Sequence, residues 1–186
     1  VALVNARLII ASLIFLPILL RKKYLPLLNP IWKHVLILSV INNMIPFTLF
    51  SFASLGSSSN ILAILNATTA FNTMVIAYFW INESVTLKQI VGLILGFIGV
   101  IILVNPQNSE ATLISSISCL LAAAFYSLST VFIQKNSAKT NKLVLIGWSI
   151  IFSAVLMMPF SYMYLPESIP SFEANISAVW LGAVST

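Results

Sequence analysis

Six long apolar segments dominate the sequence, and each is about as long as a membrane-spanning helix. They cover residues 3–20, 34–54, 58–81, 87–104, 112–134 and 143–164, and a further apolar run begins near Ile176. A hydrocarbon core of about 30 Å is crossed by about 20 helical residues. Lipid offers no hydrogen-bonding partner to the backbone, so each segment must satisfy its own peptide groups as a helix. The segments therefore predict an all-α membrane protein, a polytopic bundle of transmembrane helices.

The basic residues fall in every second gap between these segments. Eight of the nine lie there, namely Arg21, Lys22, Lys23 and Lys33 in the first gap, Lys88 in the third, and Lys135, Lys139 and Lys142 in the fifth. Short loops rich in Lys and Arg stay on the cytoplasmic side of a membrane. We therefore predict that loops 21–33, 82–88 and 135–142 are cytoplasmic and that successive helices alternate in direction.

Composition excludes a soluble protein and several other classes. The chain is 60% apolar and 7% charged, with a mean hydropathy of +1.05, whereas globular domains are about 25% charged. The net charge of +5 is spread over the loops, and nucleic-acid binders gather such charge on one face. We therefore expect no nucleic-acid partner. The single cysteine, Cys119, excludes an internal disulfide.

The residues needed for catalysis are scarce. The chain has one His, one Cys and four acids, and none of the acids lies centrally in an apolar segment. Membrane hydrolases need paired carboxylates, an activated nucleophile or metal ligands. We therefore predict that the protein is not an enzyme and has no cofactor or metal. An ion channel with charged rings is disfavoured for the same reason.

Polar residues recur along one side of segment 58–81. Asn66, Thr69, Asn72 and Thr73 are spaced i, i+3, i+6 and i+7, so they share roughly one helix face. At membrane depth such groups need a partner, either another helix or water in a cavity. They either line a pathway for a solute or form interhelical hydrogen bonds, which contribute about 0.6 kcal/mol each on average.

Two other segments carry polar residues near their middles. Asn42 and Asn43 lie in segment 34–54, and Tyr126 and Ser127 lie in segment 112–134. They are plausible partners for the polar face, although Tyr126 would serve equally as a packed aromatic with a locally bonded hydroxyl. The predicted substrate-pathway residues are Asn43, Asn66, Thr69, Asn72, Thr73 and Tyr126.

Segment 87–104 has two recognisable features. Thr86 and Gln89 have capping-box spacing, which predicts that the helix starts there. Gly92, Gly96 and Gly99 follow at i, i+4 and i+7. Glycines on one face let another helix approach closely, either within the bundle or in a homodimer.

Residues 53–104 resemble the EamA-type permeases of the drug/metabolite transporter superfamily. The resemblance rests on small and polar residues entering a helix, an apolar run closing with Glu83, then Gln89 and the three spaced glycines. The ending WLGAVST resembles the opening of the family's eighth helix. One departure is visible, because Ala70 follows two threonines where the family commonly has Pro.

The resemblance implies a ten-helix transporter fold made of two inverted repeats. Residues 1–104 would be the first repeat without its first helix, and residues 105–186 the start of the second. Because both ends fall inside apolar runs, we expect a piece of a longer protein.

The resemblance also implies a function, which is transport of a small organic solute, such as an amino acid, across the bacterial inner membrane. The mechanism would be alternating access, with efflux more common than import, and the partners would be lipid, the solute and a second copy in a homodimer. The alternatives are a non-transporting membrane scaffold or an inactive fragment of a transporter.

Overall fold

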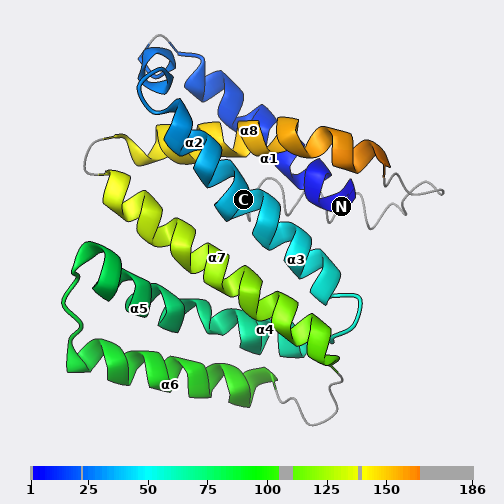
Figure 1. Ribbon diagram of the computed structural model, residues 1–186, viewed down its shortest axis with the longest axis vertical. Helices are drawn as coiled ribbons and strands as arrows, with labels where there is room; N and C mark the ends of the chain where they lie inside the picture. The colour runs from blue at the N-terminus through cyan, green and yellow to red at the C-terminus, as the bar shows by residue number, and fades with distance from the viewer. Residues whose placement is uncertain (1, 22, 105–110, 138–139, 164–186) are drawn as a thin grey trace. The chain divides into compact units, whose positions relative to one another are not determined.

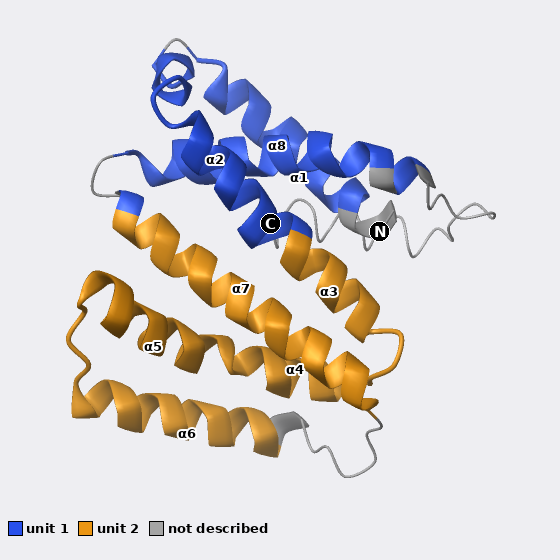
Figure 2. Ribbon diagram, viewed as in Figure 1, with its two compact units in different colours: residues 1–44, 136–186 blue, residues 45–135 orange. Residues whose placement is uncertain are grey.

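The computed structural model describes residues 2–21, 23–104, 111–137 and 140–163. The chain forms two compact units, unit 1 (residues 1–44 and 136–186) and unit 2 (residues 45–135) (Figure 2). The regular elements among the described residues are all helices, with one isolated antiparallel bridge between Ser57 and Ala111. The all-α prediction is confirmed. The apolar run predicted from Ile176 lies outside the described residues.

The helices follow the predicted apolar segments closely (Figure 1). In unit 1 they are α1 (Ala2–Leu19), η1 (Leu25–Leu28), α2 (Trp32–Leu38), η2 (Ser39–Met44) and α8 (Lys142–Met163). In unit 2 they are α3 (Ile45–Ala53), α4 (Ser59–Ala67), α5 (Thr69–Ile81), α6 (Leu87–Val104) and α7 (Leu113–Ser137), whose last two residues belong to unit 1.

Four helical runs among the described residues are long and apolar enough to cross a membrane. They are Trp32–Ala53, Ser59–Ile81, Leu113–Asn136 and Lys142–Pro159. Two shorter apolar helices, Asn5–Leu19 and Leu87–Ile102, occupy the other two predicted segments. Lipid-compatible helices thus occupy all six predicted segments, as a polytopic bundle requires.

Two of the predicted helices are interrupted. In the run Trp32–Ala53, η2 is a π-helix that ends two residues before Pro46. Pro46 has no N–H for the carbonyl of Asn42, and its ring would clash with that oxygen in an α-helix. The run Ser59–Ile81 is interrupted at Thr68, whose N–H and hydroxyl both donate to the Leu65 carbonyl, at 3.2 and 2.6 Å. These i−3 bonds replace the regular i−4 bond.

The predicted capping box is confirmed at the start of α6. The side-chain oxygen of Gln89 accepts the backbone N–H of Thr86 at 2.8 Å, and the Thr86 hydroxyl accepts the Gln89 N–H at 3.4 Å. The Thr86 N–H thereby finds a partner, and the Gln89 N–H, which also donates to the Thr86 carbonyl at 3.1 Å, gains a second one.

Within unit 1, α1 is antiparallel to α8 and α2 is parallel to it. A Cβ atom added to Gly147 would meet Leu19 and Phe15, whereas the Ser12 hydroxyl reaches the Ile150 carbonyl at 3.5 Å. Later residues of α1 therefore contact earlier residues of α8, as in an antiparallel pair. Residue numbers along α2 and η2 increase in the same direction as those along α8. Ile31 shares a cavity with Leu145, and further along both helices the Ser153 hydroxyl hydrogen-bonds Ser39 and Asn43.

Within unit 2, α4 and α5 are parallel to α7. Leu62, Thr69 and Glu83 contact Cys119, Ser127 and Gln134 in that order. Helix α3 is antiparallel to α7, because Phe47 makes an edge-on contact with Tyr126, whereas a Cβ atom added to the later Gly56 would meet the earlier Ser115. In each unit the helix directions follow the predicted alternation, so the basic gaps of that unit gather at one end.

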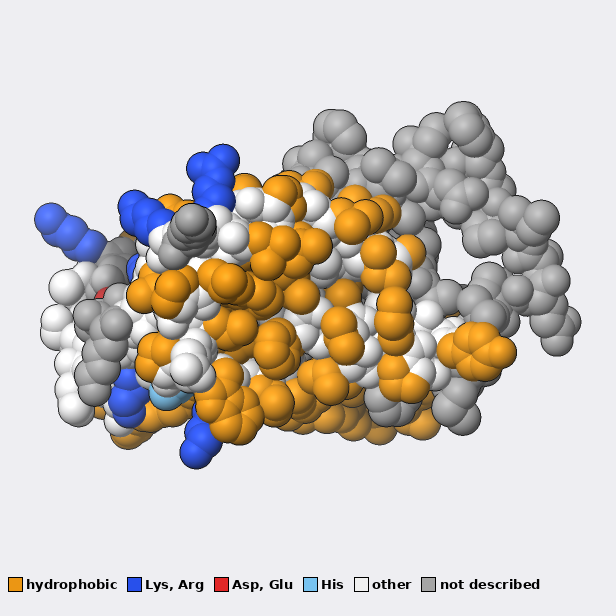
Figure 3. All heavy atoms as spheres, turned by 90° about the horizontal axis from the view of Figure 1, so that it is seen from above, with side chains coloured by type: hydrophobic (Ala, Val, Ile, Leu, Met, Phe, Trp, Pro, Cys, Tyr) orange, Lys and Arg blue, Asp and Glu red, His pale blue; other side chains and the backbone are white. Residues whose placement is uncertain are grey.

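The surface is strongly apolar. Hydrophobic side chains cover most of the face seen in Figure 3, and the Lys and Arg side chains gather at one end of it. Phe79 is 77% exposed and Ile102 is 74% exposed. Such exposure would be unfavourable in water but suits a lipid environment.

The glycines of α6 and α8 differ in their surroundings. A Cβ atom at Gly147 would lie 2.9 Å from a Leu19 methyl carbon, so this glycine permits the close contact of α1 with α8. Among the described residues, no atom lies within 4 Å of a Cβ atom built on Gly92, Gly96 or Gly99. The predicted close approach at this glycine face is therefore not made by the described residues, and the homodimer stays a prediction.

Candidate functional site

The polar stripe of segment 58–81 lies on α4 and α5 in unit 2. The Thr73 hydroxyl donates to the Thr69 carbonyl at 2.7 Å, and the Thr69 hydroxyl donates to the Asn66 side-chain oxygen at 3.2 Å. The Thr69 carbonyl also accepts the hydroxyl of Ser127 on α7 at 2.8 Å. Ser127 thus joins α7 to the backbone of the stripe at Thr69. The two alternatives for the stripe's side chains, a solute pathway or interhelical hydrogen bonds, both stay predictions.

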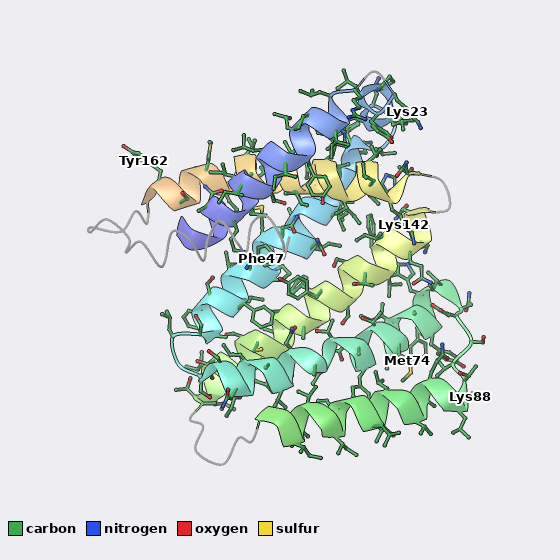
Figure 4. The ribbon with its side chains drawn as sticks, turned by 180° about the vertical axis from the view of Figure 1, so that it is seen from behind. Lys23, Phe47, Met74, Lys88, Lys142 and Tyr162 are labelled. Atoms are coloured by element: carbon green, nitrogen blue, oxygen red, sulfur yellow. The ribbon has the colours of Figure 1, made fainter. Side chains whose placement is uncertain are left out.

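A first cavity, here called the Glu83 cavity, lies where α5, α6 and α7 meet at one end of unit 2. Its volume is about 330 Å³. Its lining consists of Ala70, Thr73, Met74, Ala77, Glu83, Ser84, Val85, Gln89, Leu93 and Gln134. Figure 4 labels Met74 of its wall and, close by, Lys88 at the start of α6.

The chemistry of the Glu83 cavity is set by one carboxylate and two amides. The Gln134 amide nitrogen donates to the Glu83 carboxylate at 3.1 Å. Glu83 is the only acid among the described residues. An ionised carboxylate accepts hydrogen bonds at both oxygens, and each amide both donates and accepts. The cavity can therefore hydrogen-bond a polar solute that carries N–H or O–H groups.

Aromatic and basic side chains lie close to the Glu83 cavity, at the same end of unit 2. The Lys135 ammonium lies 5.0 Å from the centre of the Trp80 ring, and Trp80 in turn packs against Phe132 with ring centres 6.2 Å apart. A cation over an aromatic face is attracted by the ring quadrupole. Trp and Lys side chains of this kind are typical of the membrane–water interface.

A second cavity, the Asn72 cavity, has a volume of about 460 Å³. It is lined by Thr68, Asn72, Ile117, Leu120, Leu121 and Ala124. Successive residues on a helix point about 100° apart. Asn72 and Thr73 therefore line different cavities, and neither Asn66 nor Thr69 is among the described lining of either one. The role of the stripe as a solute pathway stays a prediction.

Tyr126 of α7 belongs to an aromatic cluster. Its ring centre lies 6.0 Å from that of Phe47 and 5.8 Å from that of Phe50, both on α3. Edge-on and tilted contacts at these separations are favourable. Tyr126 is not among the described residues that line the Glu83 or Asn72 cavity.

Asn43 belongs to unit 1 and is only 2% exposed. Its amide nitrogen donates to the Ser153 hydroxyl of α8 at 2.9 Å, and its oxygen accepts the Asn42 amide at 3.1 Å. The Ser153 hydroxyl lies within donating distance of the carbonyls of Ser39, at 3.1 Å, and Ser149, at 2.6 Å. Asn43 thus connects the π-helical turn to α8 through a buried network.

The sequence analysis did not identify two residues, one in the Glu83 cavity and one in the buried Asn43 network. Gln134 and Ser153 were not identified, because each is separated from its partner by 51 or 110 residues. A local signal existed for Ser153: Ser149 and Ser153 are one helical turn apart in an otherwise apolar segment. Glu83 and Gln89 were noted for the family resemblance and the cap, and the structure adds that both line a cavity.

The helices and their apolar surfaces define the class, which is an integral, multi-pass helical membrane protein. Residues 1–105 match the sequence model of the EamA-like transporter family. Because the match covers more than half of the chain, the protein belongs to this family, as the resemblance predicted.

Two relatives carry the word transporter in their names. The chain is 22% identical over 170 residues to the uncharacterized transporter YoaV of Bacillus subtilis, a match covering 90% of this chain and 58% of the relative. It is 23% identical over 194 residues to an uncharacterized transporter of Archaeoglobus fulgidus, covering 100% of this chain and 66% of the relative. The chain thus spans less than two thirds of the length of each. No solved structure matches it.

Proposed function

We propose that the protein carries a small organic solute, such as an amino acid or another metabolite, across the bacterial inner membrane, in the outward direction and by alternating access. Membership of a transporter family supports transport in general. The scarcity of charged residues at membrane depth fits a solute held by uncharged polar side chains. Asn66, Thr69, Asn72, Thr73 and the aromatic Tyr126 remain the proposed lining in unit 2, with Asn43 in unit 1.

The observation that carries the proposal is the lining of the Glu83 cavity. Thr73 of the polar stripe shares it with Glu83, Gln89 and Gln134. A few convergent polar groups on a largely apolar wall are typical of small-molecule sites. One member of the stripe, Thr73, therefore lines a cavity that can hydrogen-bond a solute at one end of the spanning helices.

The direction of transport is connected to the basic loops. The Glu83 cavity lies beside loop 82–88, which the positive-inside rule assigns to the cytoplasm. An exported solute would meet this cavity first, and the Asn72 cavity would present a polar group on another side of α5. The bundle would then alternate between openings toward the two sides.

A second candidate function is a non-transporting scaffold. The observation that favours it is the open glycine face of α6, because no described atom lies within 4 Å of a Cβ atom at Gly92, Gly96 or Gly99. Such a face can receive a helix of another chain, including a second copy of this one. A scaffold predicts that α5 is packed and dry around Asn72.

Cysteine accessibility at Asn72 separates the two functions. Asn72→Cys is made in a Cys119→Ala background, which removes the single native thiol, and membranes open on both sides are treated with a water-soluble maleimide. Transport predicts labelling at Asn72→Cys, because a thiol in a hydrated cavity ionises and reacts whereas one in lipid does not.

Two matched controls calibrate this experiment. Val75→Cys lies on the same helix at a position 50% exposed on the apolar surface, and it should stay unlabelled. Asn29→Cys, in the exposed loop between η1 and α2, should label fully. Absence of labelling at Asn72→Cys, with full labelling at Asn29→Cys, would overturn the transport proposal and favour the scaffold.

A further inference from the structure

A third cavity lies at the basic end of unit 1, and the transport proposal does not use it. This cavity, here called the His34 cavity, has a volume of about 370 Å³, within the range of small-ligand sites, about 300–1,000 Å³. His34, Asn136, Thr140 and Asn141 line its polar part, and four apolar side chains, Leu27 among them, line the rest. The lining therefore has a polar and an apolar portion, as a lipid molecule has.

The helix directions explain why the surroundings of this cavity are basic. Helix α1 is antiparallel to α8 and α2 is parallel to it, so the end of α1 and the starts of α2 and α8 share one end of unit 1. Arg21, Lys23, Lys33 and Lys142 lie at this end. Figure 4 shows Lys23 and Lys142 there and Tyr162 at the opposite end of the unit.

No acidic residue in the described part of unit 1 opposes these cations. Lys33 and Lys142 adjoin the lining residues His34 and Asn141 in the sequence, and neither lysine lines the cavity itself. Opposite charges attract more strongly near a low-dielectric wall than in water. The electrostatics of the cavity therefore favour an anion.

The start of α8 adds donors of the right kind. The Asn141 side-chain oxygen accepts the Leu143 N–H at 2.9 Å, so its amide hydrogens remain as the donating side of the group. The positive end of a 22-residue helix lies at this point. Donors, a helix N-terminus and flanking lysines together suit a phosphate group.

The surface beside the cavity favours a lipid head group over a free phosphate ester. Leu25 and Leu27 of η1 are 46% and 40% exposed, and Trp32 is 48% exposed. The ammonium groups of Lys23 and Lys33 lie 5.5 and 5.7 Å from the ring centres of Tyr24 and Trp32. Exposed leucines with aromatic and basic side chains are typical of a segment at the lipid head groups.

We propose that the His34 cavity binds the head group of one anionic phospholipid, with the lipid phosphate among His34, Thr140 and Asn141 and an acyl chain along the apolar portion. Lys33 and Lys142 supply the charge attraction. Basic pockets between transmembrane helices can bind lipid head groups in this way. The proposal stands on unit 1 alone and does not depend on the transport function.

Lipid titration of the purified, delipidated chain tests the proposal. Native mass spectrometry would count bound phosphatidylglycerol, phosphatidylcholine with the same acyl chains, and water-soluble glycerol phosphate as a competitor. We expect one tight phosphatidylglycerol site, favoured over phosphatidylcholine by about tenfold or more, since each nearby Lys or Arg contributes about fivefold toward an anionic lipid.

Matched variants locate the site. Lys33→Gln with Lys142→Gln should weaken phosphatidylglycerol binding by about 25-fold, two factors of five. Lys88→Gln is the matched control for Lys33→Gln alone, because Lys88 neither lines the cavity nor adjoins a lining residue in the sequence. Lys33→Gln should weaken binding by about fivefold and Lys88→Gln by less than about twofold. His34→Ala and the isosteric Thr140→Val each remove one donor and should weaken binding; circular dichroism verifies that every variant retains its helices.

Three results would overturn the proposal. Equal affinity for phosphatidylglycerol and phosphatidylcholine would show that charge recognition is absent. Equal weakening by Lys33→Gln and Lys88→Gln would show a diffuse charge effect without a site. Complete competition by glycerol phosphate at the same concentration as the lipid would show a site for free phosphate esters instead of a lipid.

Discussion

The buried hydrogen bond between Asn43 and Ser153 gives the most quantitative prediction. Asn43 donates to the Ser153 hydroxyl at 2.9 Å, and both side chains are essentially inaccessible. Ser153→Ala leaves the Asn43 amide buried with one partner fewer, which costs about 1–3 kcal/mol for an unsatisfied group. Hydrogen bonds between membrane helices average about 0.6 kcal/mol and reach about 1.7 kcal/mol. We therefore expect Ser153→Ala to lower the free energy of unfolding by about 1–2 kcal/mol.

A double-mutant cycle isolates the bond from the loss of packing. The free energies of unfolding of the native chain, Asn43→Ala, Ser153→Ala and the double variant would be measured by denaturant titration in mixed micelles. The expected coupling energy is about 0.6–1.7 kcal/mol, because contacting side chains are not additive.

Ser149→Ala is the matched control. Ser149 is equally buried on the same helix, but its hydroxyl donates to the Ile146 carbonyl of its own helix at 2.7 Å. Its loss should cost less than that of Ser153 and should not couple to Asn43→Ala. A coupling energy of zero between Asn43 and Ser153, or an equal coupling at Ser149, would refute the reasoning.

Two further predictions concern single positions. Gly147→Val should lower the free energy of unfolding by about 1–3 kcal/mol through overpacking against Leu19, whereas Gly96→Val, with no described atom within 4 Å, should change it much less in the same titration; equal losses would contradict this. Thr86→Ala should weaken the start of α6 by about 1 kcal/mol, seen as faster amide hydrogen exchange in the first turn, and unchanged exchange there would argue against the capping box.

The sequence allowed the helices and their relative directions to be predicted because these depend on local quantities. Apolar length specifies a spanning helix, and the basic gaps specify which ends lie together. The capping box at Thr86 was equally predictable, since its hydrogen bonds join residues three apart. Information within a few residues was sufficient for each of these features.

The interruptions of the helices could have been found only in part. Pro46 lies in the middle of an apolar segment and signals a lost hydrogen bond, but it does not say that the chain responds with a π-helical turn. Thr68 gives no comparable signal, because a threonine in a helix can bond either the i−3 or the i−4 carbonyl. The choice is made by packing that the sequence does not display.

The candidate site was the least predictable feature. The spacing of Asn72 and Thr73 indicated roughly one shared helix face, yet the two side chains line different cavities. Which cavity a side chain lines depends on where α6 and α7 pack against α5. Contacts such as that of Glu83 with Gln134 join residues 51 apart, and no local pattern predicts them.

The transport proposal requires a chain that crosses the membrane repeatedly with its basic loops on one side. Reporters of compartment inserted at Asn108 and at Ser137 test this most directly, because the two positions flank the segment 112–134. This topology predicts that the reporter at Ser137 is cytoplasmic and the one at Asn108 is on the outer side. If both reported the same compartment, the predicted topology and the transport function proposed from it would be contradicted.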